Sequence, residues 1–284
     1  MLTTINEILR KARAGHYAVP AFDCTEDVMI RPILDTCQEM KSPVILMALE
    51  HDLKGKGFAY ISSIVRGVTD HYDIPIALHL DHALEFDLIK EAIDYGFTSV
   101  MYDGSMLPFA ENVANTKRVV ELAHSHGVAV EAELGHVAGN ELDGSVGAGK
   151  EMLTDENEVQ DFVQKTNVDA LAVSIGTAHG VYVSTPNLNI PRLKAINKLS
   201  TVPLVLHGGS GTPEDQVKDA IINGITKVNI YADLRIAMLA GVKKAIESQK
   251  RVDPLPNELF QPVKDAIRKA VMEKIDMCMS NNKV

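Results

Sequence analysis

The residues best suited to chemistry in this sequence are an acid and three histidines that follow short apolar runs. Asp81 and His82 come directly after the run IALHL at residues 76–80, and His179 and His207 follow later runs of the same kind. A polar group at the end of a buried strand costs free energy unless its charge or lone pair is used there. Three such imidazoles suit a tetrahedral zinc ion with one position open to substrate, an arrangement typical of catalytic sites.

Two glutamates form a second polar group. Glu131 and Glu133 alternate along one apolar run, so we expect both on the same face of a strand. They could serve a second metal position, or they could be a structural pair satisfied by a neighbour such as Lys227. His79 lies two residues before Asp81 on its strand, and we expect it to support the site without binding metal.

Two later segments, the first rich in glycine, indicate a site for phosphate. The segment 208–211, GGSG, lets backbone N–H groups approach an anion closely, and the segment 229–232, NIYA, leads into a helix N-terminus. The loops after the seventh and eighth strands form the usual phosphate site of barrel enzymes. A tight turn is the alternative interpretation of the glycines.

The elements that must position these residues alternate between short β-like runs and longer helical patterns. Such alternation with apolar strands predicts parallel pairing and right-handed crossovers. Eight strands favour a (β/α)8 TIM barrel over an open doubly wound sheet, since no G-x-G-x-x-G follows the first strand. The expected strands are residues 17–22, 44–49, 76–80, 99–102, 129–134, 170–175, 203–206 and 227–230.

No linker or shift in composition divides the chain, so we expect a single domain over residues 1–284 with an extra C-terminal helix at 257–279. Residues 4–14 predict a helix that covers one end of the fold. The segment 135–150 is rich in Gly, Asp and Asn, which favours a mobile active-site loop over a tolerated surface insertion.

Composition limits the class of protein. A formal net charge of −10 argues against a nucleic-acid-binding surface, and any phosphate site must therefore be built locally. The three cysteines show no metal or redox spacing. The N-terminus lacks a signal peptide pattern, and no apolar run is long enough to span a bilayer. We therefore expect a cytoplasmic protein without a membrane partner.

Zinc, a phosphate site and a neighbouring carboxylate together suggest retro-aldol chemistry on a phosphorylated ketose. Zinc can polarise a ketone while the adjacent C–C bond breaks, and Asp81 can carry the hydroxyl proton. The route through a Schiff base needs a lysine at a strand C-terminus. Lys227 begins the eighth expected strand, so we expect it to face the opposite end of the barrel.

Four motifs in order give the chain a resemblance to a known family. They are LHLDHA at 78–83, VEAELG at 130–135, IGTAHG at 175–180 and LHGGSG at 206–211. The sequence resembles the class II, zinc-dependent ketose-bisphosphate aldolases, of the fructose-1,6- and tagatose-1,6-bisphosphate type, over essentially its whole length.

The resemblance implies a role for each matching residue. His82, His179 and His207 would bind one catalytic Zn²⁺, and Asp81 would be the proton donor and acceptor at the C4 hydroxyl. Asp103 and Glu133 match residues near a second metal position, and a monovalent cation such as Na⁺ or K⁺ would help to order the phosphate loops. Dihydroxyacetone phosphate would be held by Gly180, Gly208, Gly209, Ser210, Asn229, Ile230, Tyr231 and Ala232.

Three positions depart from the family pattern. Ala138 replaces a usual glycine, and Ala232 replaces a threonine or serine that would donate to phosphate. The family's Asp-Pro-Arg near the C-terminus, whose arginine holds the distal phosphate, reads DPL at 253–255 here. Because Leu255 cannot bind phosphate, either Arg251 takes that role or the aldehyde half carries no phosphate.

The leading hypothesis is therefore a lyase that cleaves a ketose 1,6-bisphosphate to dihydroxyacetone phosphate and glyceraldehyde 3-phosphate. The alternative is an aldolase for a ketose 1-phosphate. A metal-dependent hydrolase would want an early His-x-His pair, which is absent, and a non-catalytic sugar-phosphate-binding barrel would predict loss of Asp81 or of a histidine. By analogy with the family, we expect a homodimer or homotetramer.

Overall fold

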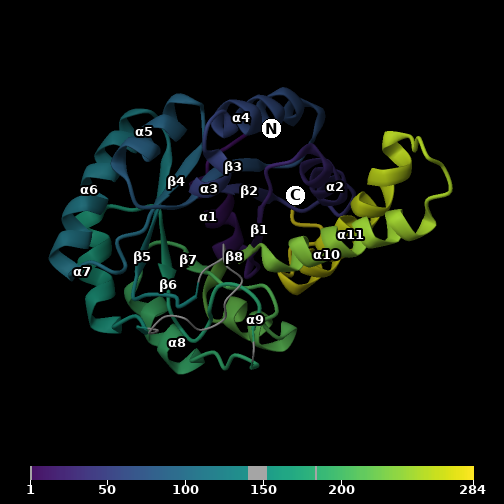
Figure 1. Ribbon diagram of the computed structural model, residues 1–284. Helices are drawn as coiled ribbons and strands as arrows, with labels where there is room; N and C mark the ends of the chain where they lie inside the picture. The colour runs from purple at the N-terminus through teal and green to yellow at the C-terminus, as the bar shows by residue number, and fades with distance from the viewer. Residues whose placement is uncertain (1, 140–151, 183) are drawn as a thin grey trace.

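A computed structural model describes residues 2–139, 152–182 and 184–284, and in it eight parallel strands close into a barrel (Figure 1). Neighbouring strands in the barrel are neighbours in sequence, and β8 pairs with β1 to close it. The predicted (β/α)8 TIM barrel is confirmed. The strands are β1 (Val19–Asp23), β2 (Val44–Leu49), β3 (Ile76–Ala83), β4 (Ser99–Tyr102), β5 (Ala129–Leu134), β6 (Ala170–Val173), β7 (Leu204–Leu206) and β8 (Ile225–Ile230).

Helices surround the barrel and account for most of the remaining described chain (Figure 1). They are α1 (Ile5–Gly15), α2 (Asp27–Glu39), α3 (Glu50–Leu53), α4 (Gly57–Val68), the 3₁₀ turn η1 (Thr69–His71), α5 (Phe86–Asp94), α6 (Phe109–Ser125), α7 (Glu156–Thr166), α8 (Ile190–Leu199), α9 (Glu214–Ile222), α10 (Ala232–Ser248) and α11 (Pro256–Met277). Of these, α11 is the extra C-terminal helix that the sequence predicts. No described helix is both long and apolar enough to cross a membrane.

Side chains alternate between two cores along each strand. One core lies between the sheet and the helices, and the other fills the barrel interior toward the N-terminal ends of the strands. The interior core is capped by α1, which buries Ile5, Ile8, Leu9 and Ala12. These four positions follow the helical spacing that predicts one apolar face, so α1 closes the N-terminal end of the barrel.

The structure changes two strand boundaries that matter for the site. β3 continues to Ala83, so Asp81 and His82 belong to the strand and do not follow it. β8 begins at Ile225, two residues before Lys227. The expectation that Lys227 begins the strand and faces the opposite end of the barrel was wrong, because its fully buried side chain reaches Glu131 on β5.

The C-terminal helices pack on one side of the barrel, where α11 lies against α10 and α2 (Figure 1). The two helices approach closely at Gly241, where a Cβ atom would lie 2.4 Å from the Cα of Val263. The turn between α10 and α11 projects away from the barrel, at the right of Figure 1. Of the loop predicted at 135–150, only residues 135–139 are described, and the rest lies outside the described residues.

Candidate active site

Three histidines from three strands or their following loops meet at the C-terminal mouth of the barrel. The ring centroids of His82 and His179 are 4.7 Å apart, those of His82 and His207 are 4.5 Å apart, and those of His179 and His207 are 5.7 Å apart. One ring nitrogen of each lies within 4.8 Å of the others. This spacing suits a shared metal ion.

Each of the three imidazoles has a buried nitrogen without a hydrogen-bond partner among the described residues. These atoms are Nε2 of His82, Nε2 of His179 and Nδ1 of His207. A buried polar atom without a partner costs free energy, so three in one cluster need an explanation. Three neutral imidazole nitrogens are a donor set that zinc prefers, and the residues present fit such a metal.

Acidic partners orient two of these rings. The Nδ1–H of His82 donates to Asp103 Oδ2 at 3.0 Å, and the Nε2–H of His207 donates to Glu131 Oε1 at 2.8 Å. Without metal, and although burial opposes it, the carboxylates of Asp81 and Asp103 raise the pKa of His82 to about 10, so this ring must lose a proton to bind metal. In the neutral rings, each bond favours the tautomer that leaves the other nitrogen as a lone pair for metal.

A distortion of β3 brings Asp81 and His82 into the same site. Consecutive residues of a regular strand point to opposite faces. Here the register with β4 shifts between Leu80 and Ala83, and His82 has a left-handed φ of 48°. Asp81 therefore stays inside the barrel, where its Oδ1 accepts a hydrogen bond from Asn229 Nδ2 at 3.1 Å, and His82 also reaches the site.

Asp81 is buried and charged. Burial alone would raise the pKa of this carboxyl group, but nearby cationic groups, first of all His82, hold it below its usual value. Asp81 is therefore available as a proton acceptor.

The two glutamates of β5 have different environments. Glu131 is completely buried and accepts hydrogen bonds from His207 and from Lys227, whose Nζ lies 2.8 Å from Oε2. Although burial opposes it, the charge of Lys227 and the bond from His207 hold the pKa of Glu131 well below its usual value. Glu131 is thus the structural partner of Lys227.

Glu133 is the member of the pair that stands near a metal position. Its Oε1 accepts the backbone N–H of Val137 at 3.0 Å, while its buried Oε2 has no hydrogen-bond partner among the described residues. Burial, with the neighbouring charge of Asp103, raises the pKa of Glu133 to about 8. His82, Asp103 and Glu133 form a second group that could hold a metal ion.

His79 lies inside the barrel next to Glu131. It is fully buried, its Nδ1 lies 2.9 Å from Ser99 Oγ, and its Nε2 lies 3.8 Å from Glu131 Oε2. Burial and the charge of Lys227 lower the pKa of His79 to about 3, so it is neutral. It lies outside both candidate metal groups.

The glycine-rich loop after β7 and the segment after β8 lie beside the histidines and are joined by hydrogen bonds. Ser210 Oγ accepts the N–H groups of Tyr231 and Asp233, at 3.1 and 3.2 Å, and thereby joins the loop after β7 to the start of α10. Gly209 donates its N–H to the carbonyl oxygen of Asn229 at 3.0 Å. The predicted phosphate residues 208–210 and 229–232 are therefore adjacent, next to a helix N-terminus that favours anions.

Glycine is required at two of these positions. A Cβ atom at Gly209 would lie 2.3 Å from Val228 Cγ1, and one at Gly208 would lie 2.3 Å from the carbonyl oxygen of Ala178. Gly180, in the loop after β6, has a φ of 90°, which disfavours other residues.

A cavity of about 450 Å³ opens above the histidines. Sequence reasoning missed His136 in its wall, although His136 follows β5 and so obeys the same rule as the other strand-end histidines. Its Nδ1 lies 3.0 Å from Ser105 Oγ. The cavity is lined by Leu49, Glu50, His51, Lys54, His82, Leu84, Asp103, Met106, His136, Val137, Gly139 and His179.

Arg251 and Leu255 lie elsewhere in this chain. Both belong to the exposed turn between α10 and α11, where Arg251 Nη2 pairs with Asp253 Oδ2 at 3.1 Å. Neither residue lines the cavity above the histidines. The structure therefore does not bring Arg251 to the candidate site of its own chain.

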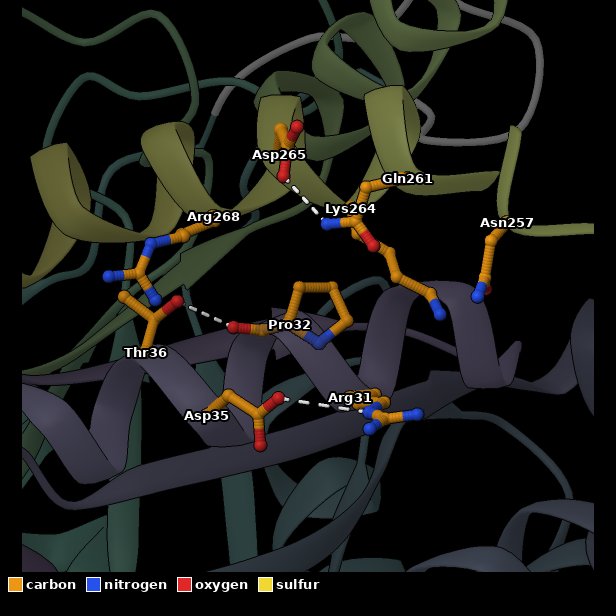
Figure 2. Close-up of a pocket in the computed structure, with 9 residues that line it drawn as sticks. All are labelled: Arg31, Pro32, Asp35, Thr36, Asn257, Gln261, Lys264, Asp265 and Arg268. Carbon is orange, nitrogen blue, oxygen red and sulfur yellow. Dashed lines mark hydrogen bonds and ion pairs between the residues drawn. The ribbon is translucent and has the colours of Figure 1, made fainter. Parts of the chain in front are cut away.

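A second cavity, of about 280 Å³, lies outside the barrel between α2 and α11 (Figure 2). We call it the α2–α11 groove. Its charges are largely paired: Arg31 contacts Asp35 at 3.8 Å, and Arg268 binds Glu39 through two nitrogens. The groove is lined by Arg31, Pro32, Asp35, Thr36, Asn257, Gln261, Lys264, Asp265 and Arg268, without a histidine or cysteine.

Comparison with known proteins decides the family. The family model described as "Fructose-bisphosphate aldolase class-II" matches residues 3–283. The chain belongs to this family. It is therefore an aldolase, a lyase that acts on a carbon–carbon bond, and the predicted resemblance is confirmed. Family membership also implies a small-molecule sugar phosphate as substrate.

Solved structures agree with this aldolase fold. The YdjI aldolase from Escherichia coli K12 is 32% identical with a TM-score of 0.88, covering 99% of this chain and 98% of that protein. The fructose-bisphosphate aldolase from Campylobacter jejuni is 24% identical with a TM-score of 0.83, covering 100% of this chain and 97% of that protein. The second likeness concerns the fold alone.

Proposed function

We propose that this aldolase catalyses zinc-dependent, reversible cleavage of a ketose 1,6-bisphosphate, of the fructose or tagatose type. The products are dihydroxyacetone phosphate and glyceraldehyde 3-phosphate. The observation that carries the proposal is the convergence of three buried imidazole nitrogens, each without a hydrogen-bond partner among the described residues, beside the buried carboxylate of Asp81.

In this proposal His82, His179 and His207 hold the zinc ion, and Asp103 and Glu133 offer a second position with His82. When bound, zinc polarises the ketone carbonyl and stabilises the negative charge that develops on its oxygen. The hydrogen bonds of Asp103 and Glu131 keep the His82 and His207 rings in the required tautomers.

Asp81 carries the proton. In the cleavage direction its carboxylate accepts the proton of the C4 hydroxyl as the bond between C3 and C4 breaks, and it returns the proton in the condensation direction. Asn229 holds Asp81 through the 3.1 Å hydrogen bond, which supports a fixed orientation toward the substrate.

The loops after β6, β7 and β8 bind the phosphate of dihydroxyacetone phosphate. Gly180, Gly208, Gly209 and Ser210 would approach it through the backbone, as would the segment 229–232 at the start of α10. By family resemblance, we expect Na⁺ or K⁺ to order these loops. Activity measured in a buffer in which a bulky organic cation replaces both Na⁺ and K⁺ would test this.

A second candidate function differs only in the aldehyde half. Leu255 stands where the family's arginine would hold the distal phosphate, and it lies on an exposed turn. This favours a ketose 1-phosphate whose aldehyde half is not phosphorylated. The two functions share the zinc site and Asp81.

We further propose that the chain is a single domain over residues 1–284 that works as a homodimer or homotetramer in the cytoplasm. Four exposed apolar side chains on α10 support association with a second copy: Ile236, Leu239, Val242 and Ile246. Three buried, unpaired cysteines fit a reducing compartment. Light scattering after size-exclusion chromatography would test the association.

The experiment that tests the function measures release of dihydroxyacetone phosphate from a panel of substrates. The panel contains fructose 1,6-bisphosphate, tagatose 1,6-bisphosphate and several ketose 1-phosphates. We expect a chelator to abolish cleavage and added zinc to restore it. Cleavage that survives complete removal of metal would contradict the proposal.

A further inference from the structure

The cavity above the histidines has a charged side chain that the proposed chemistry does not use. Lys54 lines its wall directly after α3, the short helix that follows β2. Among the described lining residues, Lys54 alone is a lysine or arginine. The side chain is exposed, so it can reach a ligand at the mouth.

The backbone around Lys54 is held in place. Leu53 is buried, and the chain turns at Gly55 with a φ of 72°. The carbonyl oxygen of Lys54 accepts the N–H of Gly57 at 3.4 Å. At Gly57 the chain returns so closely that a Cβ atom would lie 2.4 Å from the carbonyl oxygen of Asp52. A fixed backbone thus presents a flexible cationic side chain.

Lys54 has no carboxylate partner in the ion pairs formed by the described side chains, whereas Asp103 in the same wall is engaged by His82. A lysine with an open ammonium group at the rim of an acidic protein attracts anions locally. The same lining includes two exposed apolar side chains, Leu84 and Met106, and the carboxylate of Glu50.

The position of Lys54 across the barrel matters. In a closed barrel with strands in sequence order, β2 lies opposite β6, whose following loop carries Gly180, and the segments 208–211 and 229–232 follow β7 and β8. The rings of the three histidines meet at the mouth between Gly180 and the β2 side. A ketose whose 1-phosphate is held by Gly180 and by these two segments would extend past the histidines toward β2 and Lys54.

We propose that Lys54 determines specificity by binding an anionic group, a phosphate or a carboxylate, at the end of the aldehyde half. This inference rests on the proposed aldolase function. In this assignment, Lys54 on the β2 side of the mouth supplies the positive charge for the aldehyde half. Leu255 has no charge, and Arg251 of the same chain does not line the cavity.

The test compares three ketose 1-phosphates that end in a phosphate, a carboxylate or a neutral hydroxymethyl group. In Lys54→Ala we expect kcat/KM to fall about 10- to 100-fold for whichever anionic substrate the wild-type protein prefers, because one charge-assisted hydrogen bond is lost. For the neutral substrate it should change less than about twofold. Lys54→Arg should retain most of the preference.

Lys56→Ala is the matched control, because it removes the same charge two residues away, outside the cavity lining. We expect it to leave all three kcat/KM values unchanged. An equal loss for all three substrates in Lys54→Ala, or no loss at all, would overturn the assignment, as would a wild-type preference for the neutral substrate.

Solvent exchange of the C3 proton of dihydroxyacetone phosphate separates this inference from the proposed function, because it needs no aldehyde. We expect Lys54→Ala to exchange this proton at the wild-type rate. If the zinc-loaded wild-type protein fails to exchange it, the proposed function fails. If exchange is normal while the anion preference survives in Lys54→Ala, only the role of Lys54 is wrong.

Discussion

Two cavities of this aldolase, the one above the histidines and the α2–α11 groove in Figure 2, differ in how the polar groups around them are satisfied. Both are lined by charged side chains. In the groove, Arg31 and Arg268 already contact carboxylates near the protein surface. At the barrel mouth, one buried nitrogen of each of the three histidines has no hydrogen-bond partner among the described residues. Because an unsatisfied buried polar group is costly and a bound ligand can satisfy it, the comparison points to the barrel mouth as the candidate reactive site.

Removing one imidazole should produce the largest effect. His207→Ala deletes one of three converging donors and leaves Glu131 with only Lys227 as its charged hydrogen-bond partner in the described network. We expect bound zinc to fall well below one per chain and kcat to fall by about 10³-fold or more. Metal analysis by mass spectrometry beside a turnover assay checks both. Full zinc content in this variant would remove His207 from the metal site.

Replacing Asp81 should separate catalysis from metal binding. Asp81→Asn keeps a similar shape and the contact with Asn229, but it cannot accept the hydroxyl proton. We expect a loss in kcat of about 10²- to 10⁴-fold with normal zinc content. If turnover stays at the wild-type rate while zinc content is normal, Asp81 is not the proton carrier.

Changing the partner of a histidine should have a smaller effect. Glu131→Gln removes the charge that orients His207 and leaves buried Lys227 without its anion. We expect zinc affinity to fall about 10- to 100-fold. Competition with a chromophoric chelator measures it. In the double variant Glu131→Gln, Lys227→Met the buried charge is removed, so any remaining loss of affinity reports the orientation of His207 alone.

The raised pKa of Glu133 predicts a pH dependence after chelation. A carboxyl group that gains a higher pKa on folding stabilises the folded protein most when it is protonated. The contribution is complete below the unfolded pKa near 4.5 and is lost as pH rises through about 8. We expect Glu133→Gln to reduce this loss of unfolding free energy, on the order of a few kcal/mol. Urea unfolding of the chelated protein at several pH values tests it.

The smallest effect should come from the groove. Arg268→Ala removes an ion pair with Glu39 in which both side chains are substantially exposed, so we expect no change in turnover and at most about 1 kcal/mol in stability. A clear loss of aldolase activity in this variant would break the contrast between the two cavities.

Much of this fold could be predicted from the sequence because the strands are short, apolar runs separated by amphipathic segments. β2, β4 and β5 begin and end at the predicted residues. The error at Lys227 arose because a lysine at a run's edge was taken to mark its start. Its burial depends on Glu131, which lies 96 residues earlier in the chain, and no local pattern encodes that pairing.

Part of the candidate site could also be predicted from the pattern of strands. Strand ends identify Asp81, His82 and His207 because all parallel strands finish at one mouth. The different states of Glu131 and Glu133 could not be inferred, since both occupy the same face of one strand. What separates them is the charge of neighbours on other strands, Lys227 for one and Asp103 for the other.

The distortion in β3 lets two consecutive residues, Asp81 and His82, place their side chains in the same candidate site. A single planar peptide group joins them, so a displacement of this strand end moves both side chains together. Their positions relative to His179 and His207 depend instead on separate strands. We therefore expect thermal motion of the barrel mouth to change the distance between Asp81 and His82 less than it changes their distances to the rings of His179 and His207.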